Sequence, residues 1–255
     1  MKPLLELKNI NLTYQTLKTE TKALEDVSFK INECEFISLV GPSGCGKTTV
    51  LSLIAGILSP TLGEIYIDGE QITKVSTNVG YMFQRDNLFE WLNVYQNVSI
   101  GQKINHKKNC LSEEKLIKLL EKYGLKGFEK SKPNELSGGM RQRVSLIRTL
   151  ALNPKILLLD EPFSALDYQT RISVQNDIYN IIKSEKKTAI LVTHDISEAI
   201  SMSDKIIVLT KRPGTVKRII TLDFDKNLSP IERRSYPIFN KYFQELWEEL
   251  QWKKI

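Results

Sequence analysis

Hydrophobic residues recur along the chain with two spacings, and each spacing predicts a different kind of element. Alternation of apolar and polar residues predicts two half-buried strands over 4–12 and 23–31. Short runs rich in apolar residues predict further strands over 36–40, 64–70, 79–84, 155–160, 188–194, 205–209 and 216–222. Helical spacing predicts a helix that opens at Ser112, then helices over 138–152, 172–184, 196–203 and 237–252. The apolar stripe of the first of these helices is expected to consist of Leu116, Ile117, Leu119 and Leu120. Strands alternating with helices indicate an α/β fold with a mainly parallel sheet, and the first two strands indicate an antiparallel β edge layer.

Residues 85–152 differ from their flanks, because helical spacing replaces the alternation of strands and helices. We therefore expect an inserted α-helical subdomain at 85–152, inside a core formed by 1–84 and 153–222. A C-terminal helical tail over 223–255 completes what we expect to be a single domain over 1–255. Its last helix carries an apolar stripe: Phe239, Tyr242, Phe243, Leu246, Trp247 and Leu250.

Composition and length are those of a globular protein with a sizeable core. The chain has 255 residues, of which 41% are hydrophobic and 26% charged. No apolar run reaches the roughly 18 to 20 residues that a membrane-spanning helix needs. Glu6 comes too early for the apolar stretch of a signal peptide. We expect a cytoplasmic protein that is soluble alone or reaches a membrane only through a partner.

The charge and the cysteines exclude some partners. The net charge is +6, but lysine and arginine are spread along the chain without an aromatic-basic platform. This distribution favours a solvated surface over nucleic-acid binding. Cys34, Cys45 and Cys110 lack metal-ligand spacing, and such a scattered, odd set is typical of reduced thiols.

The segment between the predicted strand 36–40 and the helix after it matches the phosphate-loop pattern G-x-x-x-x-G-K-[ST]. It consists of Gly41, Pro42, Ser43, Gly44, Cys45, Gly46, Lys47 and Thr48, and Thr49 follows. Glycines let the backbone curl so that its N–H groups point at phosphate oxygens, and the helix adds its dipole. Lys47 can reach the β- and γ-phosphates, and the Thr48 hydroxyl can bind Mg²⁺. The alternative is an ordinary glycine-rich turn, but the flanking strand and helix favour a P-loop that binds nucleotide.

A phosphate loop alone fits kinases, GTPases and helicases, and the motifs further along the chain narrow the choice. They read LSGGMRQR at 136–143, ILLLDEP at 156–162 and SALD at 164–167, with His194 after its own strand. At these residues, from about Tyr14 to Thr210, the chain resembles the ATP-binding cassette (ABC) family, specifically the ATPase subunits of membrane transporters. The resemblance implies a P-loop NTPase core that hydrolyses ATP with Mg²⁺.

The resemblance also assigns catalytic and metal-binding roles. Asp160 would hold Mg²⁺ through water, and Glu161 would act as the general base on the attacking water. The alternative is that both acids merely cap the helix that follows. Gln84 would reach Mg²⁺ and water from the start of the helical insert, and His194 would contact the γ-phosphate and orient the water or the base. His106 matches no family position.

Ser137, Gly138 and Gly139 form a second candidate anion site, with a serine hydroxyl and backbone N–H groups at the start of a helix. In the family this segment caps the γ-phosphate held by the other subunit, and Asp167 also crosses that interface. The resemblance thus implies a dimer of this chain with itself or with a related cassette, with two ATPs at the interface. Tyr14 corresponds to the aromatic residue that stacks on adenine; the alternative is a buried tyrosine at a strand end.

The segment 82–98, with Trp91, resembles the importer subfamily for nitrate, sulfonates, taurine and related anions. That resemblance implies transmembrane permease subunits as partners, a periplasmic or lipid-anchored solute-binding protein acting indirectly, and a peripheral location on the cytoplasmic face of the cell membrane. Two residues depart from the family pattern: Met140 stands where many members have glutamine, and Glu90 where we expect proline.

Two other functions are also compatible with these motifs. One is a soluble ABC-class ATPase in translation, DNA repair or iron–sulfur assembly, and the other is an exporter motor. The chain has one cassette and no heptad run, whereas translation factors carry two cassettes and repair proteins insert long coiled coils. A separate ATPase chain with this 82–98 segment favours import.

Overall fold

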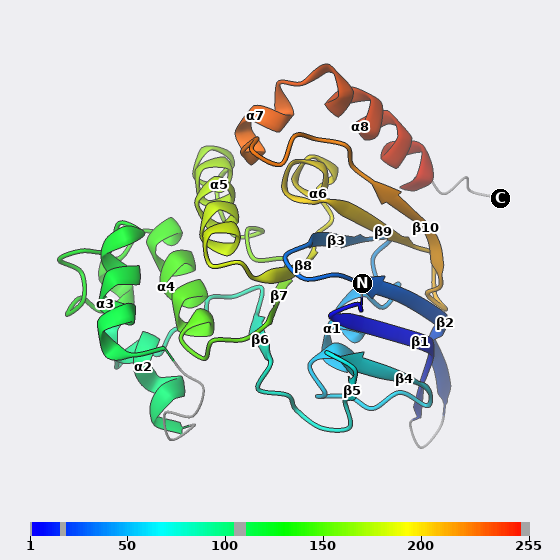
Figure 1. Ribbon diagram of the computed structural model, residues 1–255, viewed down its shortest axis with the longest axis horizontal. Helices are drawn as coiled ribbons and strands as arrows, with labels where there is room; N and C mark the ends of the chain where they lie inside the picture. The colour runs from blue at the N-terminus through cyan, green and yellow to red at the C-terminus, as the bar shows by residue number, and fades with distance from the viewer. Residues whose placement is uncertain (1, 16–18, 105–110, 251–255) are drawn as a thin grey trace. The chain divides into compact units, whose positions relative to one another are not determined.

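The computed structural model describes residues 2–15, 19–104 and 111–250. They form two compact units, unit 1 with residues 1–76 and 188–255, and unit 2 with residues 77–187 (Figure 1). His106, Cys110 and the end of the predicted last helix lie outside the described residues.

Unit 1 contains the predicted antiparallel layer. Its strands follow the order β2-β1-β4-β5, and all neighbours pair antiparallel. Their bounds are β1 Leu5–Gln15, β2 Glu20–Ile31, β4 Leu62–Ile67 and β5 Glu70–Gln71. The predicted strand over 64–70 was expected to end in a turn at Asp68 and Gly69; it does, because Asp68, with a φ of 54°, turns the chain back into β5.

The other strands of unit 1 lie in the order β10-β9-β3-β8. Their bounds are β3 Phe36–Val40, β8 Thr188–Val192, β9 Lys205–Leu209 and β10 Val216–Thr221. β3 is parallel to β8 and β9, whereas β10 pairs antiparallel with β9 and forms the predicted edge hairpin. Every residue of β3 and β8 is buried, which explains their continuous apolar sequences. Helix α1 (Lys47–Ile54) follows β3, and α6 (Ile196–Met202) follows β8.

The C-terminal part of unit 1 is helical. α7 (Pro230–Arg234) was not predicted, although Ser229 and Glu232 form a capping box at its start. α8 (Pro237–Leu250) buries Phe239 and Leu246 in an apolar cluster that includes residues of α6, β9 and β10. Trp247 departs from the predicted apolar stripe, because 51% of its surface is exposed.

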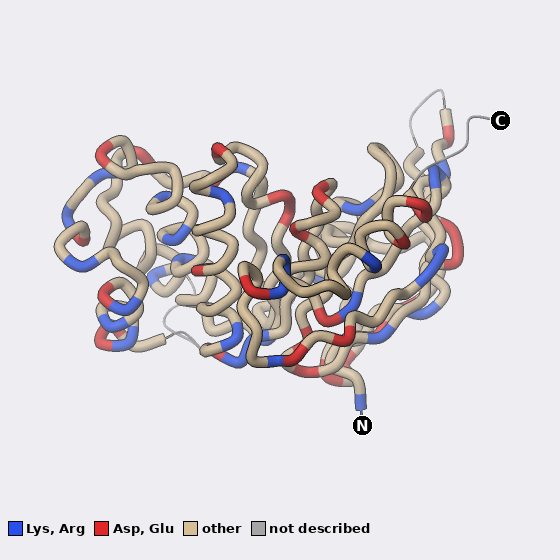
Figure 2. The backbone as a smooth tube through the Cα atoms, turned by 90° about the horizontal axis from the view of Figure 1, so that it is seen from above, with Lys and Arg blue, Asp and Glu red and all other residues tan. Residues whose placement is uncertain are grey.

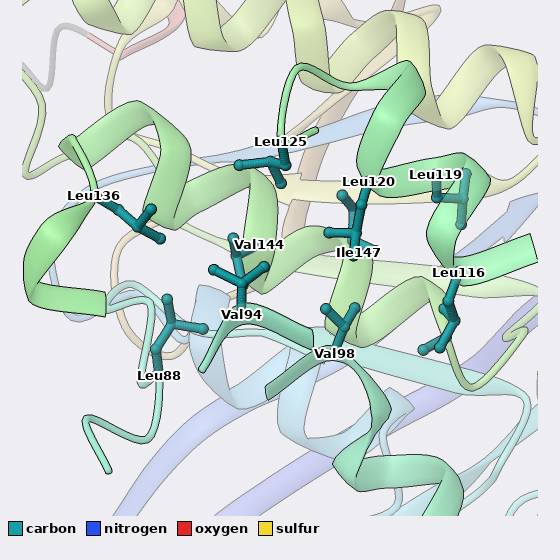
Figure 3. Close-up of a cluster of buried hydrophobic side chains, with 11 residues drawn as sticks. Leu88, Val94, Val98, Leu116, Leu119, Leu120, Leu125, Leu136, Val144 and Ile147 are labelled. Atoms are coloured by element: carbon teal, nitrogen blue, oxygen red, sulfur yellow. The ribbon is translucent and has the colours of Figure 1, made fainter. Parts of the chain in front are cut away.

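Unit 2 pairs β6 (Val79–Met82) parallel with β7 (Ile156–Asp160) and is otherwise mainly helical. They are α2 Val94–Ile104, α3 Glu113–Lys122, the 3₁₀ helix Pro133–Glu135, α4 Gly138–Leu150 and α5 Tyr168–Ser184. Apolar side chains from α2, α3 and α4 point toward one another in one cluster (Figure 3). This cluster gives α2, α3 and α4 an apolar core in common.

Three predicted details of unit 2 are wrong. Ile117 was placed on the apolar stripe of α3, but it is 44% exposed, because Leu116, Leu119 and Leu120 already fill the buried face. α5 begins at Tyr168, four residues earlier than predicted, because Asp167 caps it. α2 was not predicted as a separate helix.

The surface carries both signs of charge. Lysine and arginine alternate with aspartate and glutamate along most of the chain (Figure 2), in line with the predicted solvated surface. Within the described ranges, no helix combines the length and the apolar character that crossing a membrane requires.

Candidate functional site

The phosphate loop lies between β3 and α1, as predicted. Gly46 precedes the first helical residue with a φ of 103°, a left-handed conformation that favours glycine. A Cβ atom at this position would lie 2.6 Å from Leu24 Cδ2, so a larger residue would also displace β2. The loop geometry at Gly46 therefore depends on the absence of a side chain.

The ammonium group of Lys47 is bound by backbone carbonyl oxygens at the start of this loop. Only 8% of the residue is exposed, and Nζ donates hydrogen bonds to the carbonyl oxygens of Gly41 at 2.9 Å and Pro42 at 3.0 Å. Cys45 is fully buried beside it, and burial raises the pKa of its thiol despite the nearby Lys47 charge. Cys45 is thus a packing residue, and Lys47 supplies a fixed positive charge where phosphates would bind.

The turn at 212–214 packs against both strand β2 and the phosphate loop. Gly214 exchanges backbone hydrogen bonds with strand β2, through Ala23 and Glu25. A Cβ atom on Gly214 would collide with the carbonyl oxygen of Cys45. Glycine at this turn therefore allows β2, the turn and the phosphate loop to pack together.

Other predicted site residues of unit 1 lie around the same loop. Tyr14 is 42% exposed, and its hydroxyl lies 3.2 Å from Thr49 Oγ1, so its ring stands at the surface rather than in the core. Ser43, Gly44 and Thr48 are exposed. His194 is exposed as well, and it shares the lining of a small cavity with Gly41 and Pro42.

Predicted acidic and amide residues of unit 2 lie at the ends of β6 and β7. Gln84 Nε2 donates to Ser164 Oγ at 3.2 Å, and Ser164 Oγ donates to the carbonyl oxygen of Glu161 at 3.0 Å. The Tyr81 hydroxyl donates to Asp160 Oδ2 at 3.0 Å. The sequence did not single out Tyr81 or Ser164 for these roles, because both contacts depend on the pairing of β6 with β7.

Glu161 has an unusual backbone. Its φ is 45°, in the left-handed region that non-glycine residues seldom adopt. Asp160 ends β7, and the backbone N–H of Ser164 donates to the carbonyl oxygen of Glu161 in the turn that follows. Backbone strain of this kind gathers at active sites, which makes Glu161 a candidate functional residue.

The second candidate anion site begins a helix, as expected. Ser137 is the N-cap of α4 and accepts a hydrogen bond from the Met140 N–H at 3.3 Å. Gly138 is exposed and Gly139 buried. Met140 packs its side chain against the apolar cluster of unit 2, which gives a physical reason for an apolar residue at this position.

Asp167 caps α5 and accepts a hydrogen bond from the Thr170 N–H at 3.1 Å. Hydrogen bonds from the Thr170 side chain and backbone hold the pKa of Asp167 below its ordinary value. Its carboxylate is therefore charged at neutral pH and fixed at a helix start.

One face of α4 binds the segment that follows Gln84. Arg141 donates to the Asp86 carboxylate at 2.8 and 3.3 Å and to Glu90 at 3.1 Å. One and two turns further along, Ser145 and Arg148 donate to the Asp86 carbonyl oxygen at 3.2 and 2.7 Å. The departure from proline at Glu90 thus gives α4 an additional ion pair, and this network ties the helix capped by Ser137 to the segment after Gln84.

Comparison with known proteins identifies the family. A family described as ABC transporter matches residues 24–164, which is more than half of the chain. This chain belongs to the ABC transporter family. Proteins of the family bind ATP and hydrolyse it to drive transport, so this chain is an ABC ATPase.

Relatives of this ABC ATPase match over most of their length. YtlC of Bacillus subtilis, named an uncharacterized ABC transporter ATP-binding protein, is 46% identical and aligns over 96% of this chain and 95% of its own. SsuB of Bacillus cereus, named an aliphatic sulfonates import ATP-binding protein, is 44% identical over 81% of this chain and 82% of its own. The ATP-binding cassette MJ0796, solved as a dimer in a post-hydrolysis state with ADP and Pi, superposes with a TM-score of 0.72 at 35% identity, covering 87% of this chain and all of that one.

The donor atoms of this ABC ATPase suit Mg²⁺. Thr48, Gln84 and Asp160 offer hydroxyl, amide and carboxylate oxygens, which are the hard ligands that Mg²⁺ prefers. No cluster of three or more His, Cys, Asp or Glu side chains that could hold a metal occurs in the part of the chain that the structure describes.

The ion pair between α4 and Asp86 predicts a pH-dependent loss of stability in this ABC ATPase. Burial alone would raise the pKa of Asp86, but hydrogen bonds from Arg141 and from the Leu88 N–H outweigh it and lower that pKa. A lowered carboxyl pKa stabilises the fold above the unfolded value of about 3.9, and the contribution is lost as pH falls through the folded value. We expect Asp86→Asn to lower the free energy of unfolding by about 1–3 kcal/mol at pH 7.

This prediction is checked by urea unfolding of both proteins at pH 7 and near pH 3. The difference between wild type and Asp86→Asn should shrink at the lower pH, because pH 3 lies below the pKa of the carboxyl in the unfolded chain and the stabilisation declines from there downward. Asp223→Asn is the matched control, since Asp223 is exposed. An equal difference at both pH values would contradict the ionic origin of the effect.

Proposed function

We propose that this ABC ATPase is the motor subunit of a membrane importer, and that ATP-dependent dimer closure drives uptake of a small anion. The observation that carries the proposal is the phosphate loop, where Lys47 is buried and held by the carbonyl oxygens of Gly41 and Pro42. A fixed ammonium among inward-facing backbone groups suits the β- and γ-phosphates of ATP. Membership of the ABC transporter family supplies the coupling to transport.

Residues of unit 1 would bind the nucleotide. The backbone of Gly41–Thr48 and the side chain of Lys47 hold the phosphates, with Thr49 beside them. Tyr14 stacks on the adenine; its half-exposed ring supports this role. His194 contacts the γ-phosphate and orients the attacking water, and the cavity that it shares with Gly41 and Pro42 supports its nearness to the phosphate loop.

Residues of unit 2 would carry out the chemistry. Glu161 accepts the proton of the attacking water as general base, and its strained backbone supports a functional position. Gln84 orients water, and its hydrogen bond to Ser164 links it to the Glu161 turn. Thr48, Gln84 and Asp160 would hold Mg²⁺, which neutralises charge on the phosphates when bound.

A second copy of the chain would complete each site. Ser137, Gly138, Gly139 and Asp167 are assigned to the γ-phosphate bound by the other copy, in a head-to-tail dimer. The free serine O–H and the N-terminus of α4 suit an anion. The dimeric state of MJ0796 supports this assembly. ATP then favours closure because it binds both copies, and hydrolysis removes that bridge.

The names of the relatives support a cargo class and partners for this chain. We propose small sulfonates, taurine, nitrate or related anions as cargo, because the relative SsuB is named for import of aliphatic sulfonates. Partners would be transmembrane permease subunits, which this chain would bind as a peripheral protein on the cytoplasmic face of the membrane, with a solute-binding protein acting through them. We also propose that the chain works as one cassette domain, with its core at 1–84 and 153–222, a helical subdomain at 85–152 and a tail at 223–255.

Transport by the reconstituted complex tests the proposal. The chain is assembled in vesicles with its permease and solute-binding protein, and uptake is compared across alkanesulfonates, taurine, nitrate and thiamine-precursor pyrimidines. We expect ATP-dependent uptake of one of the anions. Uptake of the pyrimidine alone would contradict the cargo class, and ATP hydrolysis without uptake of any solute would contradict the importer function.

A further inference from the structure

The His194 segment (Thr193, His194 and Asp195) is hydrogen-bonded to the start of helix α6. The Thr193 hydroxyl donates to Glu198 Oε2 at 2.6 Å, and both residues are almost fully buried. Asp195 is the N-cap of α6: its carboxylate accepts from the Glu198 N–H at 3.1 Å, and its own N–H donates to Thr193 Oγ1 at 3.0 Å. His194 lies between these two anchored residues, so its position follows that of α6.

Helix α6 in turn is held between β3 and the C-terminal helices α7 and α8 (Figure 1). Ala199 and Ile200 of α6 share one apolar cluster with Phe239 and Leu246 of α8. At the far end of α6, the buried Arg233 of α7 donates to the carbonyl oxygens of Ser201 and Ser203 at 3.4 and 2.8 Å. The C-terminal helices therefore support α6 along its length.

The last turn of α8 shares a cavity with the start of the phosphate loop. Leu250 lines a cavity of about 130 Å³ together with His194, Ile196, Gly41 and Pro42. Leu250 is only partly buried, whereas Leu246, one turn earlier, is 1% exposed and anchors α8 in the core. Leu250 thus contributes less to the core than Leu246, but it lies where the His194 segment faces the phosphate loop.

We propose that Leu250 is a positioning residue for His194, so that the C-terminal helix takes part in ATP hydrolysis. The inference rests on the proposed role of His194 at the γ-phosphate. Leu250 lines the cavity together with His194, Gly41 and Pro42, so its side chain would help to keep the spacing between His194 and the phosphate loop. Trimming Leu250 enlarges the cavity and lets the His194 segment shift, and a displacement of about 1 Å at a reacting group can lower a rate by about 100-fold.

Steady-state ATP hydrolysis by the full chain tests this role. For Leu250→Ala we expect kcat to fall by about 10-fold with the KM for ATP nearly unchanged, because the phosphate loop itself is intact. Leu250→Met should restore most of the rate, since it restores the side-chain volume. Gln244→Ala, on the exposed side of α8, is the matched control and should behave as wild type. Thermal unfolding of each variant shows that the fold is retained.

The double variant separates positioning from packing. In a His194→Ala background, adding Leu250→Ala should leave the single-turnover rate unchanged, because the side chain that Leu250 positions is gone. A further 10-fold loss in that background would overturn the proposal. If Leu250→Ala turns over at the wild-type rate while His194→Ala is slow, the positioning role of Leu250 is overturned and the role of His194 stands. Wild-type turnover in His194→Ala would overturn the role of His194 in the proposed function itself.

Discussion

Glu161→Gln should bind ATP with wild-type affinity and lose turnover by about 100- to 10,000-fold, the contribution typical of a positioned general base. The amide has the shape of the carboxylate, so the strained turn with its φ of 45° and its hydrogen bond from Ser164 stays intact. The amide accepts no proton from water, so only the chemical step is lost. ATP binding by calorimetry and phosphate release by a continuous assay measure the two parts separately.

The Glu161→Gln variant should also form an ATP-stabilised dimer, because the nucleotide that joins the two copies persists. Size-exclusion chromatography with ATP detects this species. Glu70→Gln, at an exposed position of β5, is the control for loss of one negative charge. Hydrolysis by Glu161→Gln within a few-fold of the wild-type rate would remove Glu161 from the base role.

Much of unit 1 could be predicted because its signals are local. β3 and β9 have the predicted bounds, since each is a buried apolar run that ends at polar or turn residues. The phosphate loop was likewise predictable, because its strand, glycines and helix follow one another in the sequence. α2 was missed because buried polar residues interrupt its apolar face: Asn97 is fully buried and donates to the carbonyl oxygens of Phe89, Leu92 and Asn93.

The contacts that support the candidate site residues could not be predicted, since they join residues far apart in the sequence. Gln84 and Ser164 are 80 positions apart, and their hydrogen bond depends on β6 lying beside β7. Leu250 comes near His194 only because α8 folds back over α6. Sequence motifs indicate which side chains react, whereas the partners that orient those side chains follow from strand pairing and helix packing.

Lys47→Ala should lose ATP binding, whereas Glu161→Gln loses only hydrolysis, because the lysine substitution removes the charge that holds the phosphates. A hydrogen bond to a charged group contributes about 1.5–3 kcal/mol, so we expect the affinity for ATP to fall by about 10- to 150-fold. Hydrolysis at low ATP concentration falls with it. Calorimetric titration with ATP measures the change, and Lys30→Ala, which removes an exposed lysine in the same unit, is the control.

The fold should survive the loss of Lys47 better in Lys47→Met, which fills the same buried space while removing the ammonium. Lys47 Nζ donates to the carbonyl oxygens of Gly41 and Pro42, so part of any destabilisation reflects these two acceptors rather than nucleotide binding. If Lys47→Met keeps the thermal stability of the wild type but loses ATP affinity as Lys47→Ala does, the ammonium acts on the phosphates. If instead both variants bind ATP as tightly as the wild type, Lys47 serves only to brace the loop, and the phosphates must be held by the backbone alone.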